Sequence, residues 1–503
     1  MGQGVSRPRV RMAPAPTGMF HVGSARTALF NWLFARHHQG VFVLRIEDTD
    51  PQRSTPEAVD VILDGMHWLG LSWDEGPQVG GDHGPYFQSQ RKDIFAEHAD
   101  RLLEMGRAYR CYCTPQELEA RREEMRRRGV EFKYDRRCRD LTDAERARLA
   151  GEGRPWALRF VMPEGAIYAW EDAVVGRVEF RSDDLDDFVL VKSDGYPAYN
   201  FGCVIDDHLM AISHVIRGAD MLSNTPRQIA LYQAFEWSLP VFAHVPIILG
   251  PDRAKLSKRH GALSVLAYRD QGYLPEAMVN FLALLGWSPG DDREILSVPE
   301  LIEAFSVEGI GKSPAVFDVE KLTWMNGHYL RQCPIERLTD LVLPYLRSAG
   351  LLGVGPRYEQ ETYVEQTYVQ PVIALRQEKA KTLAEFPTLL DFFFREDIAY
   401  EPEAVAKWLA KPNAAETLAR LEMAVSGLGE APTAEEFEAI IRGLAEQLGV
   451  GAGKVIHPTR VAVTGRTKGP SLFETLHLLR RDRVVARLRH AREIAEQQVS
   501  GEQ

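Results

Sequence analysis

A strand-helix-strand pattern near the start of the chain limits the folds that are open to it. Residues 10–13 form a short apolar strand, and residues 24–38 an amphipathic helix with Ser24 as the expected N-cap and Gly40 just beyond its end. Residues 41–46 are apolar and rich in β-branched side chains, which is typical of a parallel strand buried on both faces. Parallel strands joined by a helix take a right-handed crossover, so the pattern predicts an open α/β sheet.

The turn that leads into this helix has the composition of a phosphate-binding turn. It is rich in Pro and Gly, carries His21, and brings Gly23 to the helix start, where free N–H groups and the helix dipole favour an anion. Far downstream, Lys255, Ser257 and Lys258 lie in a loop that can bring positive charge to the same anion. The two segments together predict nucleotide chemistry, although a basic loop alone is more often a solvated surface feature.

Composition excludes several other classes of protein. The chain has 503 residues, 45% of them hydrophobic, which is enough for several cores. No apolar run approaches about eighteen residues and no signal-peptide pattern is present, so we expect a cytoplasmic protein with no membrane span. Five scattered cysteines do not suggest a disulfide framework. A net charge of −11 argues against indiscriminate nucleic-acid binding, but an RNA can still bind to local basic surface.

The rest of the sequence divides into an insertion, a second half of the sheet and a helical region. Residues 99–200 combine an arginine-rich helical tract with short strands, which indicates an α+β insertion. Sheet-like sequence resumes at 206–217 and 241–249. The helix predicted between these segments starts at Thr225-Pro226, with the proline at the first helical position. Beyond this point the chain is helical, with a capping box at 433–436.

Two arginine-rich tracts stand out in this acidic chain. Each is a candidate for phosphate contact, and each is equally consistent with the solvated face of a helix. The first contains Arg121, Arg122, Arg126, Arg127, Arg128, Lys133, Arg136, Arg137 and Arg139, and the second contains Arg480, Arg481, Arg483, Arg487, Arg489 and Arg492.

Three cysteines and a tyrosine of the insertion form a candidate metal site. Cys111, Cys113 and Cys138 supply three thiolates and Tyr134 a phenolate, which together could close a tetrahedral zinc site, although tyrosine is an uncommon zinc ligand. The alternative is that the cysteines are packed or exposed thiols.

Several motifs, taken in this order and spacing, carry a family resemblance. They are Ala13–Gly18, the HIGH-like His21–Ser24, Arg45–Asp50, Lys192–Pro197, Asp206–Met210, Val215–Gly218, the KMSKS-like Lys255–Arg259 and Trp324–Gly327. On these motifs the chain from Arg9 to Arg489 resembles a glutamyl-tRNA synthetase of bacterial type, a class I aminoacyl-tRNA synthetase. The Arg-Ile-Glu-Asp-Thr-Asp segment favours the glutamyl over the glutaminyl branch.

The resemblance implies a Rossmann-like parallel-sheet catalytic domain with an α+β insertion, followed by an all-helical C-terminal region. The expected domains are 1–98 and 201–265 for the two halves of the catalytic domain, 99–200 for the insertion that binds the tRNA acceptor end, 266–335 for a helical domain that contacts the tRNA stem, and 336–503 for a helical anticodon-binding region of two subdomains.

The resemblance also implies a reaction and its partners. ATP, with Mg²⁺, would activate L-glutamate as glutamyl-adenylate, and the glutamyl group would then pass to tRNA(Glu). His21, Lys255 and Lys258 would be catalytic, and Gly23 and Ser257 would join them in binding ATP. We expect a monomer, in which zinc at Cys111, Cys113, Tyr134 and Cys138 would be structural.

Four residues are expected to bind glutamate, both from their chemistry and from the resemblance. Arg11 and Arg217 suit the side-chain carboxylate, Glu47 suits the α-ammonium group, and Tyr199 could donate a hydrogen bond to the side chain. The alternatives are a surface arginine on an edge strand for Arg11, and an ordinary ion pair with Asp220 for Arg217.

The sequence departs from the family pattern at four positions around this pocket. Ala15 stands where a serine is usual and Cys203 where an asparagine is often found, while Ala219 and Met221 replace common polar residues.

Three other functions compete with that of a glutamyl-tRNA synthetase. They are a glutaminyl-tRNA synthetase, a paralogue that glutamylates a modified nucleoside, and a non-catalytic RNA-binding protein on a synthetase scaffold. The long helical C-terminus disfavours the paralogue. The presence of His21, Lys255 and Lys258 disfavours the non-catalytic scaffold.

Overall fold

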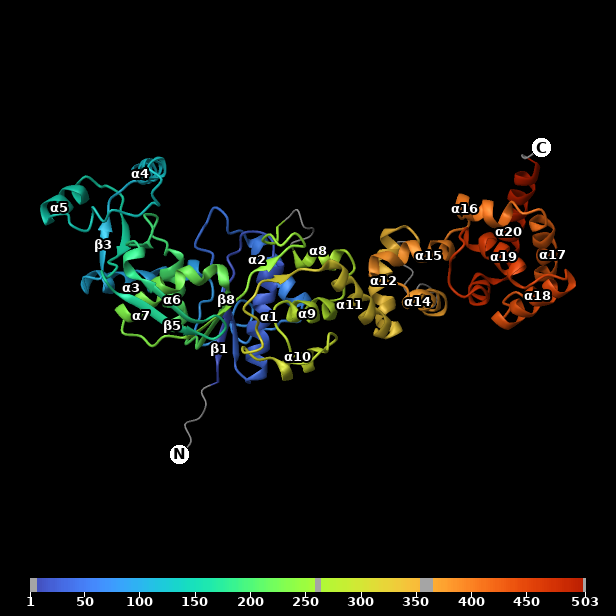
Figure 1. Cartoon of the computed structure of the whole chain (residues 1–503), viewed down its shortest axis with the longest axis horizontal. Coiled ribbons are helices and arrows are strands. Elements are labelled where there is room, and N and C mark those ends of the chain that lie inside the picture. Colours follow the sequence, from blue (N-terminus) through green and yellow to red (C-terminus); the bar gives the residue numbers. More distant parts are fainter. Residues whose placement is uncertain (1–6, 258–263, 353–364, 501–503) are drawn as a thin grey trace, which may run out of the picture. The chain divides into compact units, whose positions relative to one another are not determined.

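The structure is a computed structural model that describes residues 7–257, 264–352 and 365–500 (Figure 1). It separates into two compact units, Met1–Asp270 with Pro275–Leu322, and Gln271–Leu274 with Thr323–Gln503. The first unit is the α/β part and the second is helical, as the sequence predicts.

The strand-helix-strand pattern forms as predicted, with small shifts at its ends. β1 (Arg9–Met12) and β2 (Val41–Leu44) pair in parallel, and α1 (Val22–His37) connects them. The predicted N-cap is wrong: the helix begins two residues before Ser24, because the extended residue at its N-cap position is His21. His21 makes no side-chain capping bond, so its imidazole is not used by the helix.

Gly40 is required for a different reason than the one expected from the sequence. The left-handed residue after α1 is Gln39, at φ 52°, so the end of the helix does not itself need the glycine. A Cβ on Gly40 would instead lie 2.3 Å from the backbone oxygen of Pro8. The glycine therefore permits a close approach of two chain segments just before β2.

α1 is more deeply buried than an amphipathic helix. The apolar face expected of the helix is buried and consists of Ala25, Ala28, Leu29, Trp32 and Leu33. Phe30, Asn31, Phe34 and Ala35 outside that face are buried as well. The reason is that α9 (Pro275–Leu284) and α10 (Val298–Ala304) pack against the helix, in addition to the strands. α1 is thus a central helix of the first unit.

The second half of the α/β part repeats the parallel arrangement. β8 (His214–Gly218) pairs with β9 (Val241–Val245), and α7 (Thr225–Ala234) joins them, beginning at the predicted residue. The prediction of sheet-like structure from residue 206 is wrong, because residues 206–209 complete α6 (Tyr199–Leu209). Their helical conformation buries two consecutive aspartates, Asp206 and Asp207, beside the sheet.

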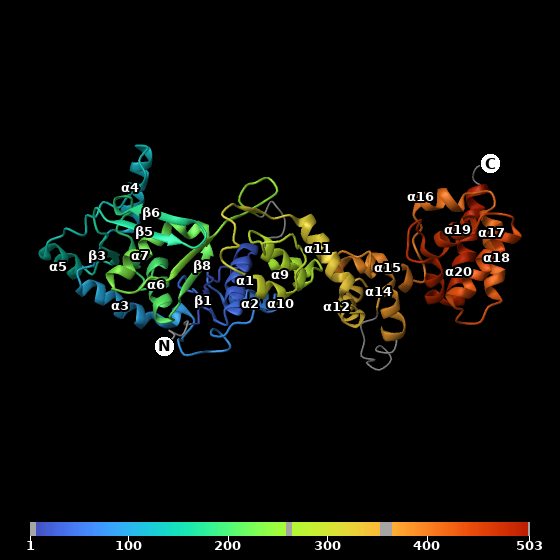
Figure 2. The ribbon, with the colours of Figure 1, turned by 60° about the horizontal axis from the view of Figure 1, so that its bottom comes forward.

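The predicted insertion mixes strands and helices. Its main sheet has the order β3-β4-β7 and is antiparallel, and a separate hairpin pairs β5 with β6 (Figure 2). The strands are β3 (Ala108–Cys111), β4 (Ala157–Phe160), β5 (Ile167–Asp172), β6 (Gly176–Arg181) and β7 (Val189–Val191), and the helices are α4 (Pro115–Arg127) and α5 (Asp143–Gly151). The last residues of β5 pack against β9 of the α/β part.

Further helices and a short pair of strands belong to the first unit. They are α2 (Pro56–Trp68), α3 (Lys92–Glu104), α8 (Val265–Asp270), and the short parallel pair β10 (Ile248–Leu249) and β11 (Ala315–Val316). α11 (Val319–Gln332) contains the point at which the two units divide.

The second unit is built of helices. Its principal helices are α12 (Ile335–Ser348), α14 (Gln370–Gln377), α15 (Phe386–Phe394), α17 (Ala414–Ser426), α18 (Ala434–Gln447), α19 (Gly453–Thr464) and α20 (Leu472–Ser500). The predicted capping box of Thr433 and Glu436 begins α18, and α17, α18 and α19 all pack against α20 (Figure 2). Within the described ranges, every helix is too short or too polar to cross a lipid bilayer.

Part of the second arginine-rich tract is not a solvated helix face, because several of its arginines hold α20 in place. Arg487 is buried and donates to the backbone oxygens of Val463, Phe392 and Arg395, each at 2.7 Å. Arg489 and Arg492 both pair with Glu422 of α17. The positive charge of this tract is therefore largely engaged inside the helical unit.

Replacing Arg487 with Met should destabilise the second unit. Three carbonyl groups, those of Val463 and Phe392 buried and that of Arg395 partly buried, would lose their donor, so the free energy of unfolding should fall by about 2–4 kcal/mol. Arg420→Met is the matched control, because Arg420 of α17 is half-exposed and pairs only with Glu416 one turn away among its described contacts. Urea unfolding of both full-length variants measures the difference, and equal stabilities would show that the carbonyl contacts contribute little.

Candidate active site

Most of the residues predicted to bind ATP or glutamate line one cavity of about 600 Å³. The cavity lies at the carboxyl ends of β1 and β8, beside the start of α1. This is the position in which open α/β sheets bind ligands. The predicted residues on its wall are Arg11, His21, Gly23, Glu47, Tyr199, Arg217 and Lys255.

One end of the cavity has the features of an anion site. His21 is exposed at the N-cap of α1, and a Cβ on Gly23 would meet no atom within 4 Å. The protein itself therefore does not require a glycine there, and the open space is available to a ligand. Lys255 is 70% exposed, with its Nζ 3.7 Å from Asp220. Ser257 is among the described residues, whereas Lys258 lies outside them.

The other end of the cavity is bounded by a buried arginine that is paired with an aspartate. Arg11 donates from Nε to Oδ1 of Asp207 at 3.0 Å, and from its terminal nitrogen to Oδ2 at 3.2 Å. Burial opposes the charge of Arg11, but the Asp207 carboxylate raises its pKa above the ordinary value. Arg11 is thus an arginine of the interior and not the exposed edge-strand residue of the alternative interpretation.

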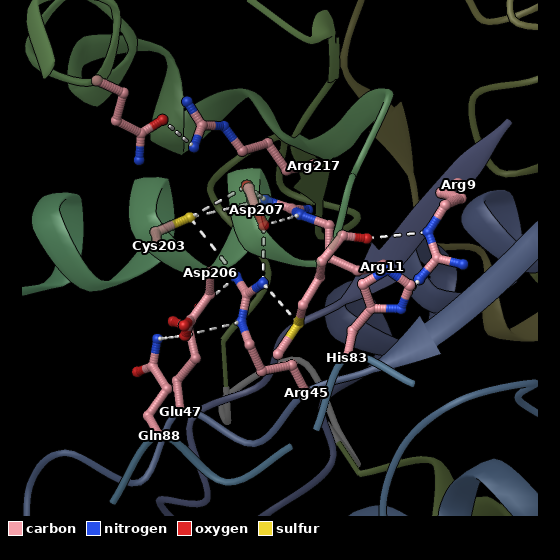
Figure 3. Close-up of polar contacts among 12 residues, drawn as sticks. Arg9, Arg11, Arg45, Glu47, His83, Gln88, Cys203, Asp206, Asp207 and Arg217 are labelled. Carbon is pink, nitrogen blue, oxygen red and sulfur yellow. Dashed lines mark hydrogen bonds and ion pairs between the residues drawn. The ribbon is translucent and has the colours of Figure 1, made fainter. Parts of the chain in front are cut away.

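Arg45 connects this pair to Glu47 (Figure 3). Its guanidinium is fully buried and lies 2.8 Å from Asp207, 3.1 Å from Glu47 and 3.7 Å from Asp206. Although burial favours the neutral acid, Arg11 and Arg45 hold the pKa of Asp207 at about 2. Burial has the larger effect on Glu47 and raises its pKa, despite the adjacent Arg45.

Arg217 differs from Arg11 in the nature of its partners. It is buried, and its guanidinium donates to His244 at 3.0 Å, to Gln228 at 2.8 Å and to Thr225 at 2.8 Å. These groups are all uncharged acceptors. The predicted alternative, an ion pair with Asp220, is wrong, since the recorded ion-pair partner of Asp220 is Lys255.

Tyr199 and Cys203 lie between the two arginines. The phenol of Tyr199, a residue that is 39% exposed, accepts a bond of 3.4 Å from Arg217. The Cys203 sulfur is 3.8 Å from nitrogens of both Arg11 and Arg45, and burial raises the pKa of this thiol to about 12. Two other departures from the family pattern, Ala15 and Met221, line the cavity itself.

Sequence reasoning missed the charged residues that support the site. Arg45, Asp206 and Asp207 lie within motifs quoted for the resemblance, but no role follows from the motifs themselves. The available signal was Arg45, a charged residue in a segment that otherwise reads as a buried strand.

The four predicted metal ligands of the insertion lie together. The sulfurs of Cys111, Cys113 and Cys138 are all within 4.8 Å of one another. The Tyr134 oxygen is 3.2 Å from the Cys111 sulfur and 3.7 Å from that of Cys113, and the Cys113 and Cys138 sulfurs are 3.7 Å apart. Ligand atoms around a tetrahedral zinc ion lie about 3.5–3.8 Å apart, so this donor set fits such an ion.

The first arginine-rich tract surrounds this cysteine cluster, and its helix is solvated. α4 has no buried residue, and three of its arginines pair with glutamates three or four positions away on the same helix. Other members reach acids outside the helix, such as Arg121 with Asp135 and Arg136 with Glu164. This arrangement agrees with the solvated-face interpretation and leaves a basic exterior.

Two family models match the chain. One, described as tRNA synthetases class I (E and Q), catalytic domain, matches residues 8–324, and one described as an anticodon binding domain matches residues 337–492. The parallel α/β fold and its cavity are therefore those of a class I aminoacyl-tRNA synthetase.

Named relatives narrow this class further. The chain is 51% identical to the glutamate–tRNA ligase of Moorella thermoacetica, over 97% of this chain and 98% of that protein. It is 45% identical to glutamate–tRNA ligase 1 of Caldanaerobacter subterraneus, over 99% and 100% of the two chains. The crystal structure of a glutamate tRNA ligase from Elizabethkingia meningosepticum in complex with its amino acid matches with a TM-score of 0.87, at 35% identity over 97% of this chain and 99% of that chain. The chain belongs to the glutamate–tRNA ligase family.

The buried carboxylate of Asp207 should make stability depend on pH in a defined window. Because the pKa of Asp207 is about 2 in the folded chain and lies near 4 in an unfolded one, its contribution is complete above pH 4 and is lost as the pH falls towards 2. Urea unfolding of the wild type and Asp207→Asn should give a stability difference that is constant from pH 7 to about 4 and shrinks below it. A difference that is independent of pH would contradict this assignment.

Proposed function

We propose that the chain attaches L-glutamate to tRNA(Glu) in two steps through glutamyl-adenylate, and releases AMP and pyrophosphate. The observation that carries the proposal is Arg217, a buried cation whose recorded partners are all neutral, in the same cavity as an open helix N-terminus. A carboxylate is the ligand that balances such a cation. The family to which the chain belongs supports the same activity.

The geometry supports a distinct role for each end of the cavity. The side-chain carboxylate of glutamate would lie against Arg217, with the Tyr199 hydroxyl beside it, and Arg11 would add positive potential from the opposite wall. Glu47 would receive the α-ammonium group. In this orientation the α-carboxylate faces the start of α1.

Activation then needs no protein nucleophile. The α-carboxylate attacks the α-phosphorus of ATP, and pyrophosphate leaves. The N–H groups at the start of α1, with His21 and Gly23, would bind the phosphates, and Lys255, Ser257 and Lys258 would stabilise the charge that develops on them. Mg²⁺ would accompany ATP as part of the substrate. Positioning of the two substrates and fixed positive charge can each lower the activation barrier by on the order of several kcal/mol.

This arrangement favours glutamate over glutamine. The amide of glutamine carries no charge, so it would leave Arg217 buried without a counter-ion. A glutaminyl activity is therefore disfavoured by the same residue that favours the glutamyl one.

We also propose that the predicted domain boundaries, a monomeric state and action in the cytoplasm hold for this chain. The second, helical unit would then bind the anticodon, and the matched anticodon-binding model supports that role. The insertion, with its arginine-rich tract, would receive the acceptor end of the tRNA.

We further propose that Cys111, Cys113, Tyr134 and Cys138 bind one structural zinc ion. The fit of the three sulfurs and the phenol oxygen to a tetrahedral arrangement supports zinc. Zinc at this position would crosslink β3 to the loop that follows α4, and it would brace the insertion.

Arg217→Ala should raise the Michaelis constant for glutamate about 100-fold, because a charge-assisted contact to the substrate is lost. The constant for ATP should stay within about threefold of the wild type, since ATP binds at the other end of the cavity. Aminoacylation of tRNA(Glu) under steady-state conditions measures both constants. Arg227→Ala is the control, because Arg227 belongs to the adjacent α7 but contacts Asp186 and Ser223. Unchanged use of glutamate by Arg217→Ala would refute the pocket assignment.

Metal content tests the zinc proposal separately. Purified wild type should hold about one zinc per chain by mass spectrometry of the metal, and Cys138→Ser should hold much less. Cys333→Ser is the control, because Cys333 is a buried cysteine of the other unit. Equal zinc content in the wild type and Cys138→Ser would remove the site.

A further inference from the structure

Arg217 is held by a buried hydrogen-bonded chain that begins in the inserted region. Its Nε donates to Nε2 of His244 at 3.0 Å, and Nδ1 of His244 is 2.5 Å from Oδ2 of Asp172. Asp172 is the last residue of β5, whereas His244 and Arg217 are register partners on β9 and β8. The exposed fractions of Asp172, His244 and Arg217 are 4%, 1% and 5%, so water does not compete for these contacts.

The chemistry of the two ends fixes the tautomer of His244. Arg217 can only donate from Nε, so Nε2 of His244 must be an unprotonated acceptor. Asp172 can only accept while it is ionised, so Nδ1 must carry the proton. The neutral tautomer with its proton on Nδ1 is the one that satisfies both contacts.

The ionisation of both groups agrees with this arrangement. Burial lowers the pKa of His244, Arg217 and Arg11 lower it further, and Asp172 opposes them without reversing the direction. Burial would raise the pKa of Asp172, but the hydrogen bonds from His244 and the backbone hold it at about 2.

We propose that Asp172 and His244 are positioning residues for glutamate recognition, which set the orientation of the Arg217 guanidinium by fixing the His244 tautomer. The proposal rests on the proposed function, because it assigns the supporting residues of the glutamate-binding arginine. Thr225 assists, since its hydroxyl lies 3.2 Å from Nε2 of His244 and 2.8 Å from a terminal nitrogen of Arg217. These contacts and the bonds to Gln228 and Tyr199 engage four of the five N–H groups of Arg217, which restricts the direction from which a carboxylate can approach.

The surroundings of Asp172 allow a sharp substitution. Its Oδ1 accepts three backbone N–H bonds of 3.1 Å, from Val174, Val175 and His244. In Asp172→Asn the amide oxygen must stay at that position, because the amide NH₂ group cannot accept those bonds. The NH₂ group therefore faces Nδ1 of His244, which must become the acceptor. The His244 proton then moves to Nε2, where it opposes the Nε–H of Arg217.

The expected result is a selective loss of glutamate recognition. Asp172→Asn should raise the Michaelis constant for glutamate about 10- to 100-fold, with the constant for ATP within about threefold of the wild type, in charging of saturating tRNA(Glu). Asp187→Asn is the matched control, because Asp187 is fully buried in the same region but accepts from Tyr109 and the backbone of Met162. Its constant for glutamate should not change.

A second variant keeps the test valid if Asp172→Asn does not fold. His244→Asn retains an N–H group near Nδ1 for Asp172 but has no atom at the position of Nε2, so it should raise the glutamate constant in the same selective way. In the wild type labelled with ¹⁵N-histidine, the resonance that disappears in His244→Asn should show Nδ1 protonated and Nε2 unprotonated.

Three outcomes overturn the proposal. The first is an Asp172→Asn enzyme with an unchanged glutamate constant, the second is an equal rise in the constants for glutamate and ATP, and the third is a His244 protonated at Nε2. A wild type that does not charge glutamate at all would instead refute the proposed function, so the two failures are distinguishable.

Discussion

The active-site cavity depends on the neutralisation of a guanidinium group that has no contact with water. The Arg45 side chain is fully buried, and an uncompensated charge at that position would cost several kcal/mol. Arg11 and Arg91 are buried close to it, and the three cations face three acids, Glu47, Asp206 and Asp207. This cluster joins β1, β2 and α6, so the same ion pairs that stabilise the fold also set the wall of the cavity. Arg217 is not part of this cluster, and its partners are neutral. An anionic substrate therefore gains the most binding free energy at this guanidinium.

Local elements of the fold could be predicted from the sequence, and their environment could not. β1, α1, β2 and the start of α7 follow from apolar patterns and turn residues that lie within a few positions of one another. The deep burial of α1 depends on α9 and α10, which lie more than 200 residues later in the chain and leave no trace in the periodicity of the helix. The sheet predicted from residue 206 begins only at His214, because Asp206, Asp207 and His208 carry no apolar pattern that separates a helix from a strand, and residues 206–209 complete α6. The burial of Arg487 could not be predicted because its three carbonyl partners belong to remote segments.

In the candidate site, too, the sequence identifies some residues and not others. The residues expected to touch substrate could be named because they lie in short motifs with a chemical reason for each residue type. The residues that hold them could not, because an ion pair such as Arg11 with Asp207, or a contact such as His244 with Asp172, joins positions that are far apart in sequence. His244 in particular reads as an ordinary core histidine of an apolar strand. Only the register of β8 against β9 and the packing of β5 against β9 bring it between Arg217 and an aspartate of the insertion.

The departures from the family pattern place more of the specificity on charge. Cys203 is buried next to Arg11, Arg45 and Asp207, where an asparagine could both donate and accept hydrogen bonds. A thiol makes only weak hydrogen bonds, and burial keeps this one protonated, so Cys203 contributes shape and little polar recognition. Ala15 and Met221 likewise bring no strong donor to the cavity. Discrimination between a carboxylate and an amide then depends chiefly on the fixed direction and uncompensated charge of Arg217. The buried hydrogen bonds that orient this guanidinium therefore matter more here than they would in a pocket lined with amides and hydroxyls.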